Sequence, residues 1–243
     1  MNTEKLCQLK ELWKAVFGDL DSFIDAFFEV AYSPDRCRYT EEQGRIGSAL
    51  YWFDCEYEGG NLAYIYAVAT HPEHRGKGLA SQLLRDTHLH LKALGYAGTV
   101  LKPANGLFPF YERLGYETSG YIRRFSVDAS TMPSAIKRLS AKEYGLLRRS
   151  YLPENGIVQE GVTLEFLSTF AEFYAAKDAI LCANVQEGIV FEYLGNPHSA
   201  PGILASLGIN NGQIPTPGKE MPFAMWHPLN CTKTPGYLGI TLE

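Results

Sequence analysis

The sequence has few cysteines, and none of them lies in a paired spacing. The five are scattered along the chain with no Cys-x-x-Cys pair: Cys7, Cys37, Cys55, Cys182 and Cys231. An odd and scattered set argues against a disulfide framework or a zinc knuckle and favours a reducing compartment. The six histidines form no His-Glu-x-x-His motif, so we expect no metal site.

Long apolar runs and an excess of basic charge are also lacking. No uncharged apolar run approaches the roughly 20 residues that cross a bilayer. Charged residues, among them Lys5 and Glu11, stand where a signal peptide needs an apolar core. The net charge of -5 gives no electrostatic reason to expect a nucleic-acid partner. We therefore expect a soluble cytoplasmic protein without a membrane partner. The sequence leaves open whether the chain forms a homo-oligomer.

What the sequence does contain is an informative strand, turn and helix. Tyr64–Thr70 is apolar, β-branched and aromatic, which predicts a buried strand that Pro72 ends. A helix is predicted from Lys77, with one apolar face made by Ala80, Leu83, Leu84, Thr87, Leu91 and Leu94. Between them lies Arg75-Gly76-Lys77-Gly78. Glycines at a helix start leave several main-chain amides open to a ligand, which predicts a phosphate site.

Two common phosphate motifs fail on their own spacing. The dinucleotide fingerprint needs a third glycine where Ser81 stands, and the P-loop needs Ser or Thr where Gly78 follows Lys77. The remaining pattern, Arg75-x-x-Gly78-x-Ala80, resembles the signature of the GNAT acetyltransferase superfamily. The resemblance implies that the stretch Arg75, Gly76, Lys77, Gly78, Leu79, Ala80 and Ser81 holds the pyrophosphate of acetyl-CoA. The alternative is a flexible turn without a ligand.

A second motif extends the resemblance. Asn105 and the run Tyr111-Glu112-Arg113-Leu114-Gly115-Tyr116 are similar to the family's Asn, short helix and Tyr-x-x-x-Gly-Phe/Tyr. In the family this tyrosine protonates the departing CoA thiolate, a task that suits a donor with a pKa of about 10. The resemblance thus implies catalysis by Tyr111 and binding of the cofactor by Val68, Ala69, Thr70 and Asn105. Alternatively, Tyr111 is one core aromatic among 15 tyrosines.

The element pattern predicts an α+β protein of two domains, 1–128 and 135–243, separated by the polar stretch 128–134. The first has two helices, 5–17 and 22–31, a hairpin from 37 to 57, and the strand, turn and helix above. The resemblance implies a GNAT fold there, a mixed and mostly antiparallel sheet with flanking helices.

The second domain is predicted as two helices, 140–151 and 164–176, paired strands 179–185 and 189–194, a helix at 199–207, and strands 223–226 and 237–242. This order echoes the first domain and predicts a degenerate GNAT-like unit, with an unrelated α+β domain as the alternative. The stretch Gly195–Gly208 stands where the phosphate turn should be. It lacks the arginine and the glycine pair, so we expect no CoA there.

Within the superfamily, the segments LWKAVFGD, YIYAVATHPEHRGKGL and FYERLGY are most similar to the enhanced-intracellular-survival group. The resemblance covers roughly the first half of the chain and implies transfer of an acetyl group to a primary amine by direct attack in a ternary complex. The alternative is a catalytically silent acyl-CoA-binding or sensor module. The general base stays open between Glu56, Glu58, His71, His74 and the C-terminal carboxylate of Glu243.

Overall fold

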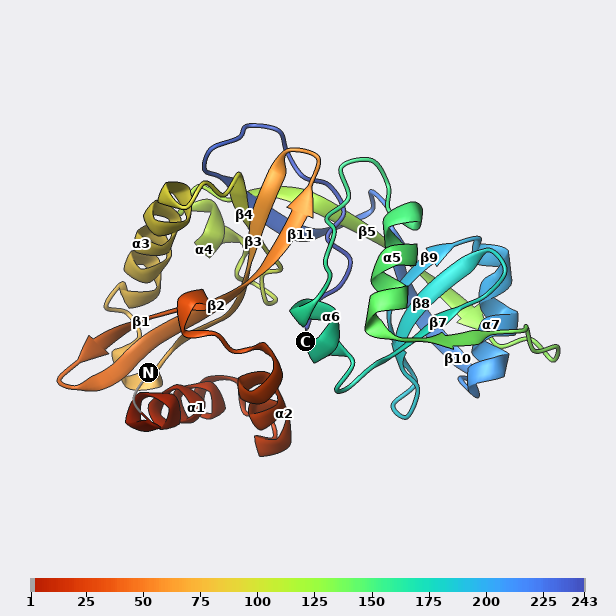
Figure 1. Ribbon diagram of the computed structural model, residues 1–243, viewed down its shortest axis with the longest axis horizontal. Coiled ribbons are helices and arrows are strands. Elements are labelled where there is room, and N and C mark those ends of the chain that lie inside the picture. The colour runs from red at the N-terminus through yellow and green to blue at the C-terminus, as the bar shows by residue number, and fades with distance from the viewer. Residues whose placement is uncertain (1–2, 243) are drawn as a thin grey trace. The chain divides into compact units, whose positions relative to one another are not determined.

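The computed structural model describes residues 3–242, and contacts between residues divide the chain into two units (Figure 1). Unit 1 comprises Met1–Cys55, Gly59–Glu117 and Trp226–Lys233, and unit 2 comprises Glu56–Glu58, Thr118–Met225 and Thr234–Glu243. The predicted division into 1–128 and 135–243 stays a prediction. The contacts instead assign residues 118–128 to unit 2 and bring residues 226–233 back to unit 1.

Unit 1 is built on a mixed sheet. Its strands follow the spatial order β1-β2-β3-β4-β11, with the bounds β1 Cys37–Glu42, β2 Arg45–Tyr57, β3 Gly60–Thr70, β4 Gly98–Leu101 and β11 Met221–Pro228. Of β11, only residues 226–228 belong to unit 1. β1 and β2 pair antiparallel, whereas β3 and β4 pair parallel. Gln43 and Gly44 connect β1 to β2 with φ angles of 53° and 82°, and two positive φ values match the twist of a tight hairpin.

Helices cover both faces of this sheet (Figure 1). They are α1 Thr3–Phe17, α2 Asp21–Ala26 with a π-helical continuation η1 Phe27–Ala31, α3 Leu79–Ala93 and α4 Phe108–Glu112. Successive side chains of a strand point to opposite faces. Tyr51 of β2 accordingly lies 5.6 Å from Trp13 of α1, ring centre to ring centre. The next residue, Trp52, lies 6.2 Å from His90 of α3. The alternation in β2 thus supplies an aromatic core on the α1 side and a second core under α3.

Unit 2 contains a separate antiparallel sheet in the order β6-β7-β8-β9. Its strands are β6 Lys137–Leu139, β7 Glu172–Ala175, β8 Ala179–Asn184 and β9 Ile189–Gly195, and its helices are α5 Ala141–Tyr151, α6 Val162–Leu167 and α7 Ala200–Leu207. β5 Glu117–Asp128 pairs antiparallel with β10 Asn211–Pro217. A core of buried apolar residues joins β8, β9, α7 and β10, and includes Leu181, Tyr193, Ile203 and Ile214.

The two units repeat one order of elements. Unit 1 runs α1, α2, β1, β2, β3, a 3₁₀ turn η3 Pro72–His74, α3, β4, and unit 2 runs α5, α6, β7, β8, β9, a 3₁₀ turn η4 Pro197–Ser199, α7, β10. The residue before each 3₁₀ turn, His71 or Asn196, accepts a hydrogen bond on its side chain from the amide two residues later. The predicted α+β class, with a mixed, mostly antiparallel sheet and flanking helices, is confirmed.

Two predicted elements of unit 2 are wrong. The predicted helix 164–176 ends at Leu167, and Glu172–Ala175 forms strand β7. Phe173 pairs there with Cys182 of β8 and stacks on Tyr144 at 4.6 Å, so tertiary pairing overrides the helical spacing. The predicted strand 237–242 is irregular. Two of its carbonyl groups accept hydrogen bonds from side chains, since Arg148 donates to Leu238 O and Gln159 donates to Ile240 O, each at 2.9 Å. Tyr237 O accepts from the main-chain amide of Ile157 at 2.8 Å.

Candidate active site

Strands β3 and β4 separate at the point where the sheet could admit a ligand. Their parallel pairing runs only from Leu62↔Gly98 to Tyr64↔Val100, although β3 continues to Thr70. Ala67 has a φ of +47° in the middle of β3. A left-handed residue inside a strand marks a bulge that turns the strand away from its neighbour. The end of β3 therefore offers main-chain groups that β4 does not use.

The turn that follows β3 is closed by Arg75, whose Nε donates to Thr70 O at 3.3 Å. Gly76 and Gly78 each have a φ of +78°, a conformation that a residue with a Cβ adopts only under strain. Gly78 is the N-cap residue of α3, and it provides no side-chain cap. The amide of Gln82 makes the first bond of the helix, to Gly78 O at 3.0 Å.

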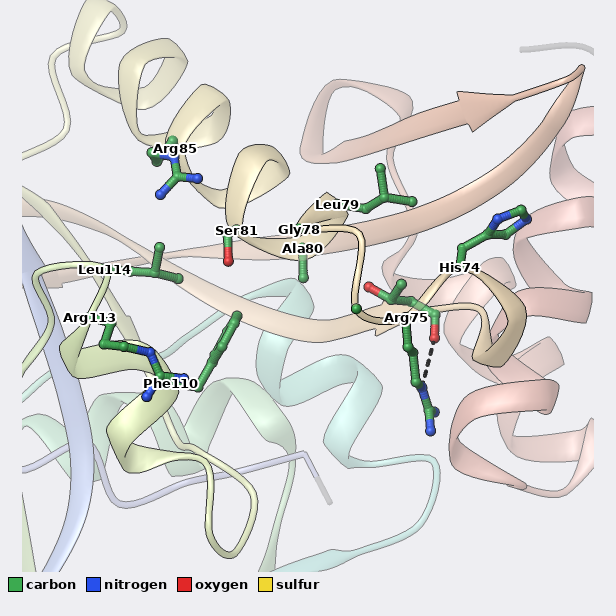
Figure 2. Close-up of a pocket in the computed structure, with 12 residues that line it drawn as sticks. His74, Arg75, Gly78, Leu79, Ala80, Ser81, Arg85, Phe110, Arg113 and Leu114 are labelled. Atoms are coloured by element: carbon green, nitrogen blue, oxygen red, sulfur yellow. Dashed lines mark hydrogen bonds between the residues drawn. The ribbon is translucent and has the colours of Figure 1, made fainter.

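The amides of the first turn of α3 therefore have no carbonyl partner within the helix. These are the amides of Leu79, Ala80 and Ser81, and they begin a helix of 15 residues. The positive end of the helix dipole adds to their attraction for an anion. This end of α3 opens into a cavity of about 480 Å³, which we call the turn cavity (Figure 2). α3 contributes one side of it and α4 the other.

Seven of the predicted cofactor residues line the turn cavity: Thr70, Arg75, Gly76, Gly78, Leu79, Ala80 and Ser81. The other four predicted cofactor residues do not line it. Val68 and Ala69 lie upstream on β3, where Ser48 Oγ donates to Ala69 O at 2.7 Å. Lys77 Nζ instead lies 3.4 Å from Glu42 Oε2, and Asn105 is exposed in the loop before α4.

Five further lining residues were not among the predicted cofactor residues: His74, which the sequence analysis names only as a candidate base, and Arg85, Phe110, Arg113 and Leu114. Arg85 follows Gly78 by two helical turns, a spacing that places both on one face of α3. With Arg75, three arginines and no carboxylate residue are thus among the residues that line the cavity. In the described part of the chain, no carboxylate forms an ion pair with Arg85 or Arg113. The charge of the cavity favours a ligand with several phosphate groups.

Comparison with known proteins identifies this half of the chain. Residues 1–119 match the family described as Acetyltransferase (GNAT) domain. Residues 1–119 belong to the GNAT acetyltransferase family. No curated protein matches the sequence.

Solved structures share the fold over nearly the whole chain. A GCN5-related N-acetyltransferase from Kribbella flavida is 19% identical, with a TM-score of 0.68 over 95% of this chain and 71% of that one. A GCN5-related N-acetyltransferase from Anabaena variabilis is 14% identical, with a TM-score of 0.72 over 94% and 71%. Eis1 from Mycobacterium abscessus is 11% identical, with a TM-score of 0.68 over 95% and 72%. The fold of these proteins therefore extends beyond the GNAT domain into unit 2.

Tyr111, the predicted catalytic acid of the GNAT domain, lies on α4 and is only 6% exposed. Pro109 fits the first turn of this helix, where a missing amide costs no hydrogen bond. The Tyr111 ring lies 5.0 Å from that of Phe110, which lines the turn cavity, and 5.5 Å from that of Tyr116. Tyr111 is therefore in the wall behind the cavity, and its catalytic role stays a prediction.

The candidate general bases of unit 1 have polar neighbours already. His74 Nδ1 lies 3.0 Å from Glu42 Oε2, and His71 Nδ1 lies 3.9 Å from Glu73 Oε2. In unit 2, Glu56 lies 3.6 Å from Arg149, and Glu58 belongs to the same unit. Glu243 lies outside the described residues. None of these contacts distinguishes one candidate as the base.

The corresponding turn of unit 2 contains a carboxylate instead of cations. Ser199 Oγ donates to Asp178 Oδ1 at 2.7 Å, and Asn196 Nδ2 donates to Asp178 Oδ2 at 2.9 Å. These two hydrogen bonds lower the pKa of the Asp178 carboxyl below its usual value and keep it charged. A fixed negative charge beside the start of α7 opposes a second anion there. This arrangement favours the prediction that Gly195–Gly208 does not hold CoA.

Within residues 3–242, no helix is long and apolar enough to cross a bilayer.

Proposed function

We propose that the chain transfers an acetyl group from acetyl-CoA to a primary amine, of a small molecule or of a peptide. The observation that carries the proposal is the turn cavity at the start of α3, lined by three arginines within a GNAT domain. The first-turn amides and the arginines bind the pyrophosphate, and the open end of β3 receives the pantetheine arm. Lys77 and Asn105 contribute from the two loops beside the cavity.

The reaction proceeds by direct attack in a ternary complex. The lone pair of the neutral amine forms a C–N bond to the thioester carbonyl, and the C–S bond then breaks. Main-chain groups of Val68, Ala69 and Thr70 position the thioester, where a fixed donor stabilises the charge on its oxygen. Tyr111 gives its proton to the departing thiolate, and the new amide nitrogen loses a proton to a base or to water. The location is proposed as the cytoplasm.

A catalytically silent acyl-CoA-binding module is the second candidate. It is favoured because the buried strand β3 carries Tyr64 and Tyr66 and no carboxylate. Replacing Tyr111 with Phe distinguishes the two. An enzyme loses turnover by roughly 10²-fold or more and keeps its affinity for CoA. A silent module shows no turnover before or after the change.

A thermal-shift assay with acetyl-CoA tests the binding step, with Ser81→Glu as the disrupting variant. Ser81 lines the cavity, and a glutamate in the first turn of a helix is compatible with folding. Ligand at a hundredfold excess over its Kd adds about 2.7 kcal/mol of stability to the native protein. We expect the stabilisation in the native protein and its loss in Ser81→Glu.

Gln82→Glu is the matched control, since Gln82 is exposed next to Ser81 and does not line the cavity. It should bind acetyl-CoA like the native protein. If the native protein shows no stabilisation, or if Ser81→Glu is stabilised as well, the assignment of the donor site is wrong.

A further inference from the structure

The proposed acid, Tyr111, lies on a very short helix. α4 has five residues, Phe108–Glu112, and a helix of this length is not stable by itself in water. The position of α4 therefore depends on its contacts with the rest of unit 1. Because a misplacement of about 1 Å can lower a rate by about 10²-fold, these contacts bear directly on the proposed reaction.

Tyr116 fixes the end of α4 through its main chain and through its ring. The carbonyl of Tyr111 accepts hydrogen bonds from the amides of Leu114 at 2.9 Å and of Tyr116 at 3.1 Å. The two tyrosine rings lie 5.5 Å apart, centre to centre, with an angle of 72° between them. Edge-to-face pairs of this kind have a preferred geometry. The place of the Tyr116 ring therefore constrains the place of the Tyr111 ring.

The hydroxyl group of Tyr116 is buried and is bonded to two other elements. Thr99 Oγ1 of β4 donates to it at 2.9 Å, and His88 Nε2 of α3 lies 2.9 Å from it. Each of these three residues is at most 6% exposed. A buried polar group that loses its partner costs free energy. This network therefore holds α3, β4 and the end of α4 together.

Every hydroxyl proton of the network has an acceptor when Tyr116 donates to His88. Thr99 gives its proton to the Tyr116 oxygen, so the proton of Tyr116 is accepted by His88 Nε2. Burial and the neighbouring His227 lower the pKa of His88 to about 3, so its ring is neutral and has one unprotonated nitrogen. Among the described residues, the opposite direction would leave the buried Tyr116 proton without an acceptor.

β11 holds the network from a further side. The rings of His88 and His227 stack at 4.2 Å with an angle of 13° between them. His227 Nδ1 donates to Gly115 O at 2.9 Å, because a carbonyl can only accept. A Cβ on Gly115 would lie 3.1 Å from the His227 ring, so glycine permits this close approach. The end of α4 is thus fixed to α3, β4 and β11 through residues of unit 1.

The same bond connects the two walls of the turn cavity. His88 follows Arg85 by three residues, which places both on one side of α3. Arg85 lines the cavity from α3, and Phe110 lines it from α4 (Figure 2). Loss of the bond between Tyr116 and His88 would let α4 move relative to α3. The first-turn amides of α3, which are proposed to bind the pyrophosphate, would stay in place.

We propose that Tyr116 and His88 are positioning residues that hold the Tyr111 hydroxyl at the sulfur of the donor. This inference rests on the proposed function, because Tyr111 has to be the acid. The two residues act through α4 and not by contact with the donor. Since the family signature has either Phe or Tyr at position 116, the hydroxyl network is a feature of this chain and not a requirement of the fold.

Release of CoA from acetyl-CoA tests this assignment, with hydroxylamine as the acceptor because it is a small amine that is neutral at neutral pH. In Tyr116→Phe we expect kcat to fall about tenfold or more. The Kd of acetyl-CoA, measured by calorimetry, should stay within about twofold of the native value. This variant should fold, because the family signature allows Phe at this position.

Two substitutions of His88 test the hydrogen bond itself. His88→Leu removes the acceptor and should lower kcat as Tyr116→Phe does. His88→Gln should restore most of the rate, since its amide oxygen can accept the Tyr116 proton. Thr87→Val is the matched control, because the buried Thr87 donates to Leu83 O within α3. It should lower stability and leave kcat unchanged.

A double-mutant cycle separates positioning from a general loss of stability. If Tyr116 acts through Tyr111, then Tyr116→Phe should lower kcat no further in a protein that already has Tyr111→Phe. An equal loss in both backgrounds, an unchanged kcat in Tyr116→Phe, or a His88→Gln as slow as His88→Leu would overturn the inference and leave the proposed function intact.

The remaining outcomes concern the acid and the enzyme. If Tyr111→Phe keeps the native rate, another group is the acid, and this inference fails while transfer of the acetyl group stands. If the native protein does not accelerate the reaction of acetyl-CoA with hydroxylamine, the proposed function and this inference both fail.

Discussion

At the scale of single residues, Ala67 has a strained backbone conformation at the place where β3 is proposed to receive the donor. Its φ of +47° is unfavourable for any residue with a Cβ, at a cost of roughly 1–2 kcal/mol. This strained residue lies where β3 continues beyond its pairing with β4. No feature of an alanine in an apolar run signals such a bulge, so the sequence could not predict it.

Glycine at position 67 should therefore be tolerated, whereas glycine at position 69 should destabilise the strand. Ala67→Gly removes the strain, which offsets the roughly 0.5–1 kcal/mol that glycine costs in a strand. Ala69→Gly is the matched control, because Ala69 is buried and is not among the positive-φ residues. Urea unfolding should show little change for the first variant and a loss of about 1 kcal/mol for the second. Equal losses would contradict a strained Ala67.

His88 makes a prediction about pH at the same scale. Its pKa is lowered from 6.5 to about 3 in the folded chain, chiefly by burial. Between pH 6.5 and about 3, His88 binds a proton in the unfolded chain but stays neutral in the folded chain. The contribution of neutral His88 to the free energy of unfolding is therefore complete above pH 6.5 and is lost as the pH falls toward 3. The loss is at most about 1.4 kcal/mol per pH unit.

Replacing His88 with Gln should remove the loss of stability that His88 causes as the pH falls. Urea unfolding at several pH values between roughly 4 and 7 measures this, because the range covers the upper part of the fall from pH 6.5 toward 3. His90→Gln, on the same helix, controls for the loss of an imidazole. A variant at position 88 that keeps the full acid-dependent loss would show that His88 is not the group responsible.

At the scale of elements, the accuracy of sequence reasoning depends on where the stabilising partners come from. The glycine turn after β3 and helix α3 agree with the prediction, because glycines and apolar spacing act within the element. Arg113 was missed as a cavity residue, since α4 brings it there from a separate motif. β10 was missed because Pro215 and Pro217 argue against a strand. The larger sheet ends in the order β11-β5-β10, so β10 is an edge strand, where proline is tolerated.

The irregular segment at residues 236–240 was also mispredicted because its stabilising partners come from other parts of the chain. Its main chain is held by Arg148, which is 1% exposed and pairs with Glu192 at 2.8 Å and with Ile157 O at 2.8 Å. Tyr144 also donates to Glu192, at 2.7 Å. A buried cluster of this kind fixes a segment that has no ladder of its own.

Removal of the Arg148 side chain should therefore be costly. Arg148→Met leaves the Glu192 charge buried without its partner and the Leu238 carbonyl without its donor, and we expect a loss of about 3–5 kcal/mol. Arg149→Met is the control, because the neighbouring Arg149 makes exposed ion pairs that are worth about 1 kcal/mol or less. Similar losses in urea unfolding for both variants would argue against the cluster as the fixing element.

At the scale of the whole molecule, the chain repeats one order of elements and uses its two turns differently. The turn of unit 1 leads into a cavity with three arginines, whereas the turn of unit 2 is occupied by the carboxylate of Asp178. This difference in charge between two turns at the same place in the order of elements supports the proposal of a single donor site. The charge of a turn depends on a few side chains, while the order of elements depends on the apolar pattern of the whole unit.

The stoichiometry of donor binding follows from this difference. Calorimetric titration should give one molecule of acetyl-CoA per chain, and Ser81→Glu should abolish that binding completely. Asp178→Ala should leave the stoichiometry at one, because removing a carboxylate supplies neither glycines nor arginines to the start of α7. Binding of one molecule per chain that survives in Ser81→Glu would mean that the turn cavity is not the donor site, whereas two sites in the native chain would mean that unit 2 also holds the donor. In that case the charge of the turn would not decide which unit binds, and the main-chain amides of α7 would have to suffice despite the carboxylate beside them.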